Sequence, residues 1–176
     1  MLVLLQFLGS VSLAAALHVL GLRIHPATAQ FFEPFLIVGL YCSLRRGPAV
    51  SALAGTVVGL AHDALSGSLY GLHGFATTLA CYVTSRMQIR MMIHQLSQVA
   101  LLLLLASAFH QALLGTLQFL LVPSAELPGV LATLIKMATT CLFGTALYAA
   151  ADRAAEWRQQ RLDKRSQRPS LGTRGH

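Results

Sequence analysis

Apolar residues in this chain come in six blocks, separated by breaks that are polar or contain Pro and Gly. Five blocks are about 17 to 27 residues long, and a helix needs roughly 20 apolar residues to cross the hydrocarbon core of a membrane. They cover residues 2–22, 48–65, 69–85, 96–122 and 130–151. The sixth block, 31–44, reaches spanning length only with residues 27–30, and predicts a short, tilted or broken span. We therefore expect an all-α polytopic membrane protein, a bundle of six transmembrane helices.

Basic residues fall almost entirely in every second break. Eleven Lys and Arg residues lie in connections on one side of the predicted bundle, and only Arg23 lies in a connection on the other side. The eleven are Arg45, Arg46, Arg86, Arg90, Arg153, Arg158, Arg161, Lys164, Arg165, Arg168 and Arg174. The positive-inside rule makes their side cytoplasmic, so six spans place both termini in the cytoplasm. A five-span alternative that omits block 31–44 fits this charge pattern less well.

Composition leaves little of the chain for a water-soluble domain, because 55% of the residues are hydrophobic and 11% are charged. We expect a transmembrane domain over residues 1–151 and a basic cytoplasmic tail over 152–176, helical at first and partly disordered. The first block lacks a basic region before it and continues to Leu22, so it is not expected to be a cleaved signal. The net charge of +7 resides at span ends and in the tail, which favours anionic lipids over nucleic acid as partners.

The sequence offers no arrangement typical of an enzyme, cofactor or metal site. Cys42, Cys81 and Cys141 lie singly in three blocks, so we interpret them as small buried side chains. His62 and His73 flank a Gly-rich turn together with Asp63 and could in principle meet around a metal. Their spacing matches no helical pair of ligands, and polar helix ends are the ordinary interpretation.

A stripe of small residues follows one face of block 48–65. Residues four apart share a face of a helix, and small residues on such a face let two membrane helices approach closely. We therefore predict a helix-packing or partner interface, with a neighbour from this chain or from another. The residues assigned to it are Ser51, Gly55, Gly59, Asp63, Gly67, Gly71 and His73.

Among the polar residues inside the last two blocks, four are candidate intramembrane polar groups, namely His110, Gln111, Gln118 and Lys136. An ionisable group within a span is a functional candidate. The ammonium group of Lys136 could snorkel towards the headgroups, pair with Asp63 or Glu126, or contact a ligand or partner protein. These three interpretations stay open at the level of the sequence.

The stretch from Pro34 to Tyr82 resembles MreD, the rod shape-determining integral membrane protein of bacteria. The resemblance rests on Pro34 opening the short span, Tyr41 before the basic Arg45-Arg46 turn and Pro48, and the run G-L-x-x-D-x-x-S-G-x-x-x-G-L-H. That run begins at Gly59 and ends at His73. The length, the number of spans and the orientation of the chain also resemble this family.

The resemblance implies a non-enzymatic scaffold of the cell-elongation complex in the bacterial inner membrane, supporting rod shape and peptidoglycan synthesis. It implies binding to the single-span protein MreC, and indirectly to the actin-like MreB, RodA and a class B penicillin-binding protein. MreD-like chains also resemble the S-component fold of energy-coupling-factor transporters. The alternative function is thus a membrane carrier for a small vitamin-like molecule. Its pocket would use Asp63, His73, His110, Gln111, Gln118, Glu126 and Lys136.

Overall fold

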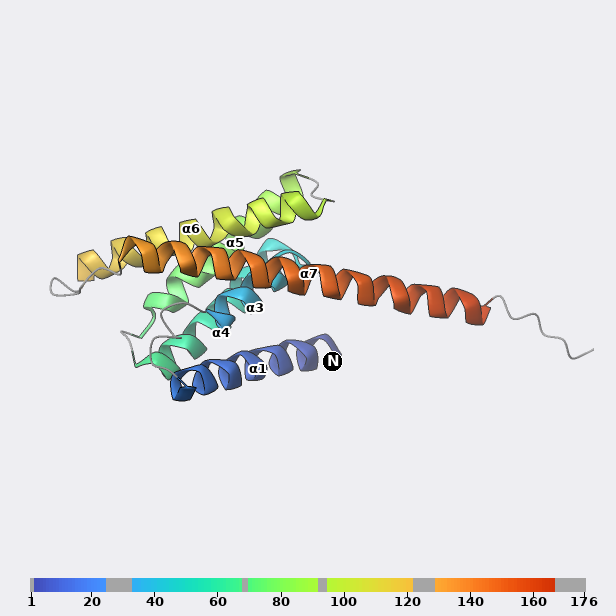
Figure 1. Cartoon of the computed structure of the whole chain (residues 1–176), viewed down its shortest axis with the longest axis horizontal. Helices are drawn as coiled ribbons and strands as arrows, with labels where there is room; N and C mark the ends of the chain where they lie inside the picture. The colour runs from blue at the N-terminus through green and yellow to red at the C-terminus, as the bar shows by residue number, and fades with distance from the viewer. Residues whose placement is uncertain (1, 25–32, 68–69, 92–94, 122–128, 167–176) are drawn as a thin grey trace, which may run out of the picture.

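The computed structural model of the chain describes residues 2–24, 33–67, 70–91, 95–121 and 129–166, and the regular structure in these residues is helical throughout (Figure 1). The helices are α1 (Leu2–Ile24), α3 (Pro34–Ser43), α4 (Pro48–Ser66), α5 (Leu72–Met91), α6 (Leu96–Leu121) and α7 (Val130–Ser166). The predicted all-α architecture with six helices is confirmed for this part of the chain.

Three of the helices are long and apolar enough to cross a membrane: α4, α6 and the part of α7 from Val130 to Ala154. Helix α1 has 23 residues, the length predicted for a span, and α3 is short, as predicted. Helix α5 has 20 residues but is more polar than the other predicted spans. Helix α3 has 10 residues and rises about 15 Å, roughly half of the hydrocarbon core.

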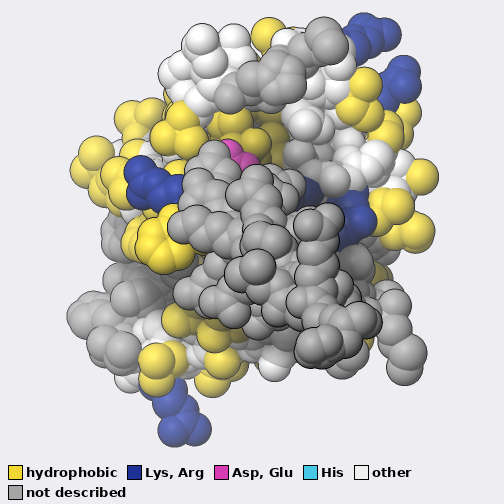
Figure 2. Space-filling model, turned by 90° about the vertical axis from the view of Figure 1, so that its right-hand side faces the viewer, with side chains coloured by type: hydrophobic (Ala, Val, Ile, Leu, Met, Phe, Trp, Pro, Cys, Tyr) yellow, Lys and Arg dark blue, Asp and Glu magenta, His cyan; other side chains and the backbone are white. Residues whose placement is uncertain are grey.

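Successive helices run in opposite directions, so the start of α1 and the end of α7 lie at the same end of the bundle (Figure 1). Arg45, just after α3, lies 3.7 Å from Asp152 of α7. We call this the basic end, because α5 also delivers Arg86 and Arg90 to it. Figure 2 looks onto this end, with dark-blue Lys and Arg side chains around its rim. The opposite end carries the α4–α5 connection, and we call it the turn end.

Helix α3 is the centre of the bundle and packs against all five other helices. Pro34 at its first turn suits a helix start, where the missing N–H has no intrahelical acceptor to satisfy. Leu36, Leu40 and Leu44 are buried and pack against α6 residues that include Leu103. The short helix therefore holds the others at fixed distances from one another.

The remaining helices surround α3 in the order α1, α4, α5, α6, α7, each in contact with the next. Within the described residues, α1 and α7 make no contact with each other. The ring around α3 is therefore open on one side.

Helix α7 continues without a break past the bundle, projecting from the basic end as Figure 1 shows. Its 37 residues rise about 55 Å, well beyond the thickness of a membrane core. The first part of the tail is thus helical as far as Ser166. The end of the tail, residues 167–176, for which disorder was predicted, lies outside the described residues.

Candidate functional site

The small-residue stripe of α4 faces α5 of the same chain. A Cβ atom added to Gly59 would lie 2.6 Å from Cα of Gly74, and one added to Gly55 would lie 2.9 Å from the carbonyl oxygen of Thr77. Both distances are shorter than real Cβ contacts allow, so only glycine permits this approach of two backbones. The hydroxyls of Thr56 and Thr78 add a hydrogen bond of 2.8 Å between the two helices.

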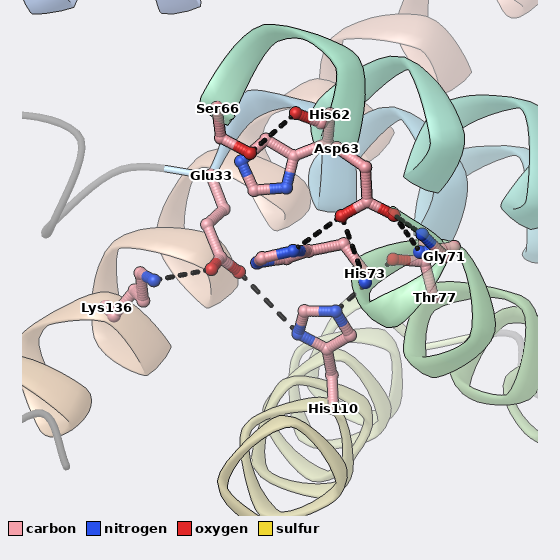
Figure 3. Close-up of polar contacts among 10 residues, drawn as sticks. Glu33, His62, Asp63, Ser66, Gly71, His73, Thr77, His110 and Lys136 are labelled. Atoms are coloured by element: carbon pink, nitrogen blue, oxygen red, sulfur yellow. Dashed lines mark hydrogen bonds and ion pairs between the residues drawn. The ribbon is translucent and has the colours of Figure 1, made fainter. Parts of the chain in front are cut away.

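At the turn end the stripe finishes with Asp63, whose carboxylate caps the start of α5. It accepts hydrogen bonds from the backbone N–H groups of Gly71 (2.9 Å), His73 (3.2 Å) and Gly74 (3.1 Å) (Figure 3). A carboxylate at a helix N-terminus satisfies otherwise unpaired donors and interacts favourably with the helix dipole. Gly71 has φ of +96°, a conformation that other residues rarely adopt. Asp63 therefore fixes the geometry of the α4–α5 connection.

Lys136 is paired with Glu33, which precedes α3. The ammonium nitrogen lies 2.5 Å from Oε1 of this buried carboxylate. On the other carboxylate oxygen, Gln111 of α6 donates a hydrogen bond of 3.2 Å, and Nδ1 of His110 lies 3.7 Å away. One carboxylate thus connects α3, α6 and α7, and the pair avoids the cost of a lone charge inside a membrane, about 2.5 to 3.5 kcal/mol on insertion scales.

Histidine side chains connect the surroundings of the Asp63 and Glu33 carboxylates into one group (Figure 3). Nδ1 of His73 lies 2.8 Å from Oδ1 of Asp63, and the ring of His73 lies 4.3 Å from that of His62. The ring of His62 in turn lies 5.2 Å from that of His18 on α1. On the other side, Nε2 of His110 and the hydroxyl of Thr77 form a hydrogen bond of 3.3 Å.

We call this group the polar cluster, and each of the six helices or the residue preceding it supplies a member. It consists of His18, Glu33, His62, Asp63, His73, Thr77, His110, Gln111 and Lys136. Lys136 pairs with Glu33, and Asp63 accepts hydrogen bonds from backbone N–H groups of α5, so the direct effect of the cluster is to hold the helices together at the turn end. Among the described residues, no three His, Cys, Asp or Glu side chains are placed to hold a metal ion.

The structure also decides among the interpretations that the sequence left open for Lys136. The suggested pairing of Lys136 with Asp63 is wrong, because Asp63 binds the start of α5 while Lys136 reaches Glu33. The other suggested partner, Glu126, lies outside the described residues. Gln111 joins the cluster and Gln118 does not, within the part of the chain that is described.

Glu33 and His18 were not recognised as site residues. The signal for Glu33 was present, because it begins one predicted span and Lys136 lies early in another of the same direction. Opposite charges at similar depth on parallel helices are candidates for pairing. No comparable signal identifies His18, whose placement depends on how α1 leans against α4.

Comparison with known protein families assigns this chain to one of them. Residues 1–148 match the family described as rod shape-determining protein MreD. The chain belongs to the MreD family. The family is a membrane family that determines cell shape, and the match covers every helix of the bundle up to Tyr148 within α7. No curated protein and no solved structure gives a significant match, so the likeness to transporter S-components stays a prediction.

Proposed function

We propose that this MreD-family chain is a non-enzymatic, multi-pass scaffold of the cell-elongation complex in the bacterial inner membrane. The single observation that carries the proposal is the family match over residues 1–148. Three span-competent helices and the alternating direction of all six support six crossings, with residues 1–151 as the membrane domain. The gathering of Arg side chains at one end supports placing that end, and both termini, in the cytoplasm.

The polar cluster favours a scaffold over a carrier. A binding site for a small molecule needs polar groups that point into a pocket and await a ligand. Here Lys136 forms an ion pair with Glu33, and the Asp63 carboxylate accepts hydrogen bonds from backbone N–H groups at the start of α5. These contacts occupy the two charged groups among the described residues that the carrier alternative would use, and they support a bundle that presents surfaces to other proteins.

The expected direct partner is MreC, a single-span protein. Through it the chain would connect to MreB, RodA and a class B penicillin-binding protein, and so support peptidoglycan synthesis and rod shape. At the basic end, Arg45, Arg46, Arg86 and Arg90 are suited to the anionic headgroups of the cytoplasmic leaflet, at about 1 kcal/mol for each basic residue near the surface. The tail from residue 152 onward adds further basic residues on this side.

Affinity capture tests this function. The tagged full-length chain is co-expressed with candidate elongation proteins, solubilised in mild detergent and captured, and its companions are identified by mass spectrometry. Recovery of a single-span protein with a periplasmic domain is the expected result, together with restored rod shape when the chain is supplied to cells lacking their own copy. Recovery of ABC-type ATPases instead would overturn the scaffold in favour of the carrier.

A further inference from the structure

One face of the central helix α3 is not covered by the described helices. Nearly every α3 residue is buried, but Val38, Tyr41 and Cys42 are half-buried, and Arg45 just beyond the helix is exposed. These positions are three, four and seven residues apart, so they share one face.

This face lies between α1 and α7. Val38 packs against the core group that contains Ala14 of α1. The guanidinium carbon of Arg45 lies 5.4 Å from the ring centre of Tyr41 and 5.6 Å from that of Tyr148 on α7. Since α1 and α7 make no contact within the described residues, the uncovered face of α3 forms the floor between them.

The arrangement leaves room for one more helix. Around a central cylinder, six cylinders of equal diameter fit side by side, and α3 is surrounded by five helices. The remaining place, between α1 and α7, matches one helix of about 10 Å diameter, packed at the usual axis separation of about 8 to 10 Å. Cys42 on the floor is small enough to permit close approach of that helix.

At the basic end, the gap between α1 and α7 is bordered by the positively charged side chain of Arg45. The Arg45 guanidinium lies between Tyr41 of α3 and Tyr148 of α7, 3.7 Å from the exposed carboxylate of Asp152. An occupant that carries a carboxylate where it leaves the membrane would be complementary to this guanidinium group.

We propose that the slot, formed by Val38, Tyr41, Cys42 and Arg45 between α1 and α7, binds a single transmembrane helix of a partner protein. That helix is apolar through its span and carries an Asp or Glu at its cytoplasmic border. The proposal rests on the proposed scaffold function and assigns the face of the bundle that such a scaffold uses.

Site-specific photocrosslinking tests whether this face of the bundle binds the partner helix. A benzophenone amino acid replaces Tyr41 in the slot, or Val57, which is 50% exposed on α4, as the matched control. In cells that also express the partner recovered by affinity capture, position 41 should give an adduct with that partner at least about tenfold stronger than position 57. An adduct only at position 57, no partner adduct at either position, or an adduct at position 41 with a second copy of this chain would each overturn the slot.

Filling the slot gives a second measurement. Cys42→Trp places a large ring on its floor, whereas Val57→Trp adds the same ring to an exposed face. We expect Cys42→Trp to lower the recovered partner about tenfold per folded molecule, and Val57→Trp to leave it unchanged. Undiminished capture by folded Cys42→Trp would refute the slot while the scaffold stands. Failure of the unaltered chain to capture any single-span protein would refute both.

Discussion

At the scale of single residues, the contact with the largest expected consequence is the ion pair between Glu33 and Lys136. Removing one partner of a buried pair leaves an uncompensated charge and costs about 3 to 5 kcal/mol. We therefore expect Glu33→Gln and Lys136→Met each to lower the unfolding temperature in detergent clearly. The double variant should recover part of the loss, corresponding to a coupling of about 0.5 to 3 kcal/mol.

The control for this pair is Asp63, one of the two partners that the sequence suggested for the lysine. Because Asp63 binds backbone donors of α5 instead, Asp63→Asn and Lys136→Met should have additive effects on stability. Additivity of Glu33→Gln with Lys136→Met would contradict the observed pairing.

Gly59 offers a second test at this scale, because a single methyl group should be too large there. In Gly59→Ala the new Cβ would meet the backbone of Gly74 at 2.6 Å, and overpacking of this kind costs about 1 to 3 kcal/mol. Gly115 of α6 is the matched control, since a Cβ there meets nothing within 4 Å. Gly115→Ala should be neutral or stabilising by up to about 1 kcal/mol, as helix propensity favours alanine. Thermal unfolding of both variants measures the difference, and equal tolerance would refute the close approach.

The sequence predicts how deep a residue lies in the membrane, but not which neighbouring helix its side chain faces. It located small residues four apart on one face of α4, and that face does meet a neighbouring backbone. Spacing along one helix, however, contains no information on which helix lies opposite. The same limit explains why the sequence left the environment of Lys136 open, because several acidic residues, Asp63 and Glu33 among them, lie near the same end of the bundle.

At the scale of helices, Asp63 joins α4 to α5, and its loss should loosen this pair more than any other. Asp63→Ala removes the acceptor for three backbone N–H groups at the start of α5, leaving buried donors unpaired at about 1 to 3 kcal/mol. Thr116→Ala is the control, because its exposed hydroxyl bonds back to the carbonyl of Ala112 within α6. Hydrogen exchange of the α5 amides should accelerate in Asp63→Ala and stay unchanged in Thr116→Ala. Unchanged exchange in both would contradict the capping role.

The sequence predicted the order and approximate bounds of the helices, because breaks rich in Gly, Pro and charge interrupt apolar runs. It did not predict that α3 is central. A helix that is apolar on all sides is buried on all sides, either in protein or in lipid, and hydropathy cannot distinguish these surroundings. The shortness of α3 was the available clue, since 10 residues cannot face lipid across a whole membrane.

At the scale of the whole molecule, the alternation of helices and the charge at one end predict a definite topology. In a background without native cysteines, a cysteine at Ser66 should react with a membrane-impermeant reagent added outside the cell. Cysteines at Gly47 and Ala154 should not react until the membrane is opened, since they lie at the basic end. Labelling of Gly47→Cys in intact cells would refute six crossings with cytoplasmic termini.

The central place of α3 has a consequence for biosynthesis. Four of the five helices that cover α3 follow it in the chain and are made later, and the counter-charge of Glu33 resides on the last of these four. Until Lys136 emerges, the nascent chain holds an unneutralised carboxylate beside a helix too short to span the bilayer alone. Commitment to the final arrangement therefore awaits the synthesis of α7, and a chain truncated before α7 presents membrane quality-control proteases with an exposed acidic residue.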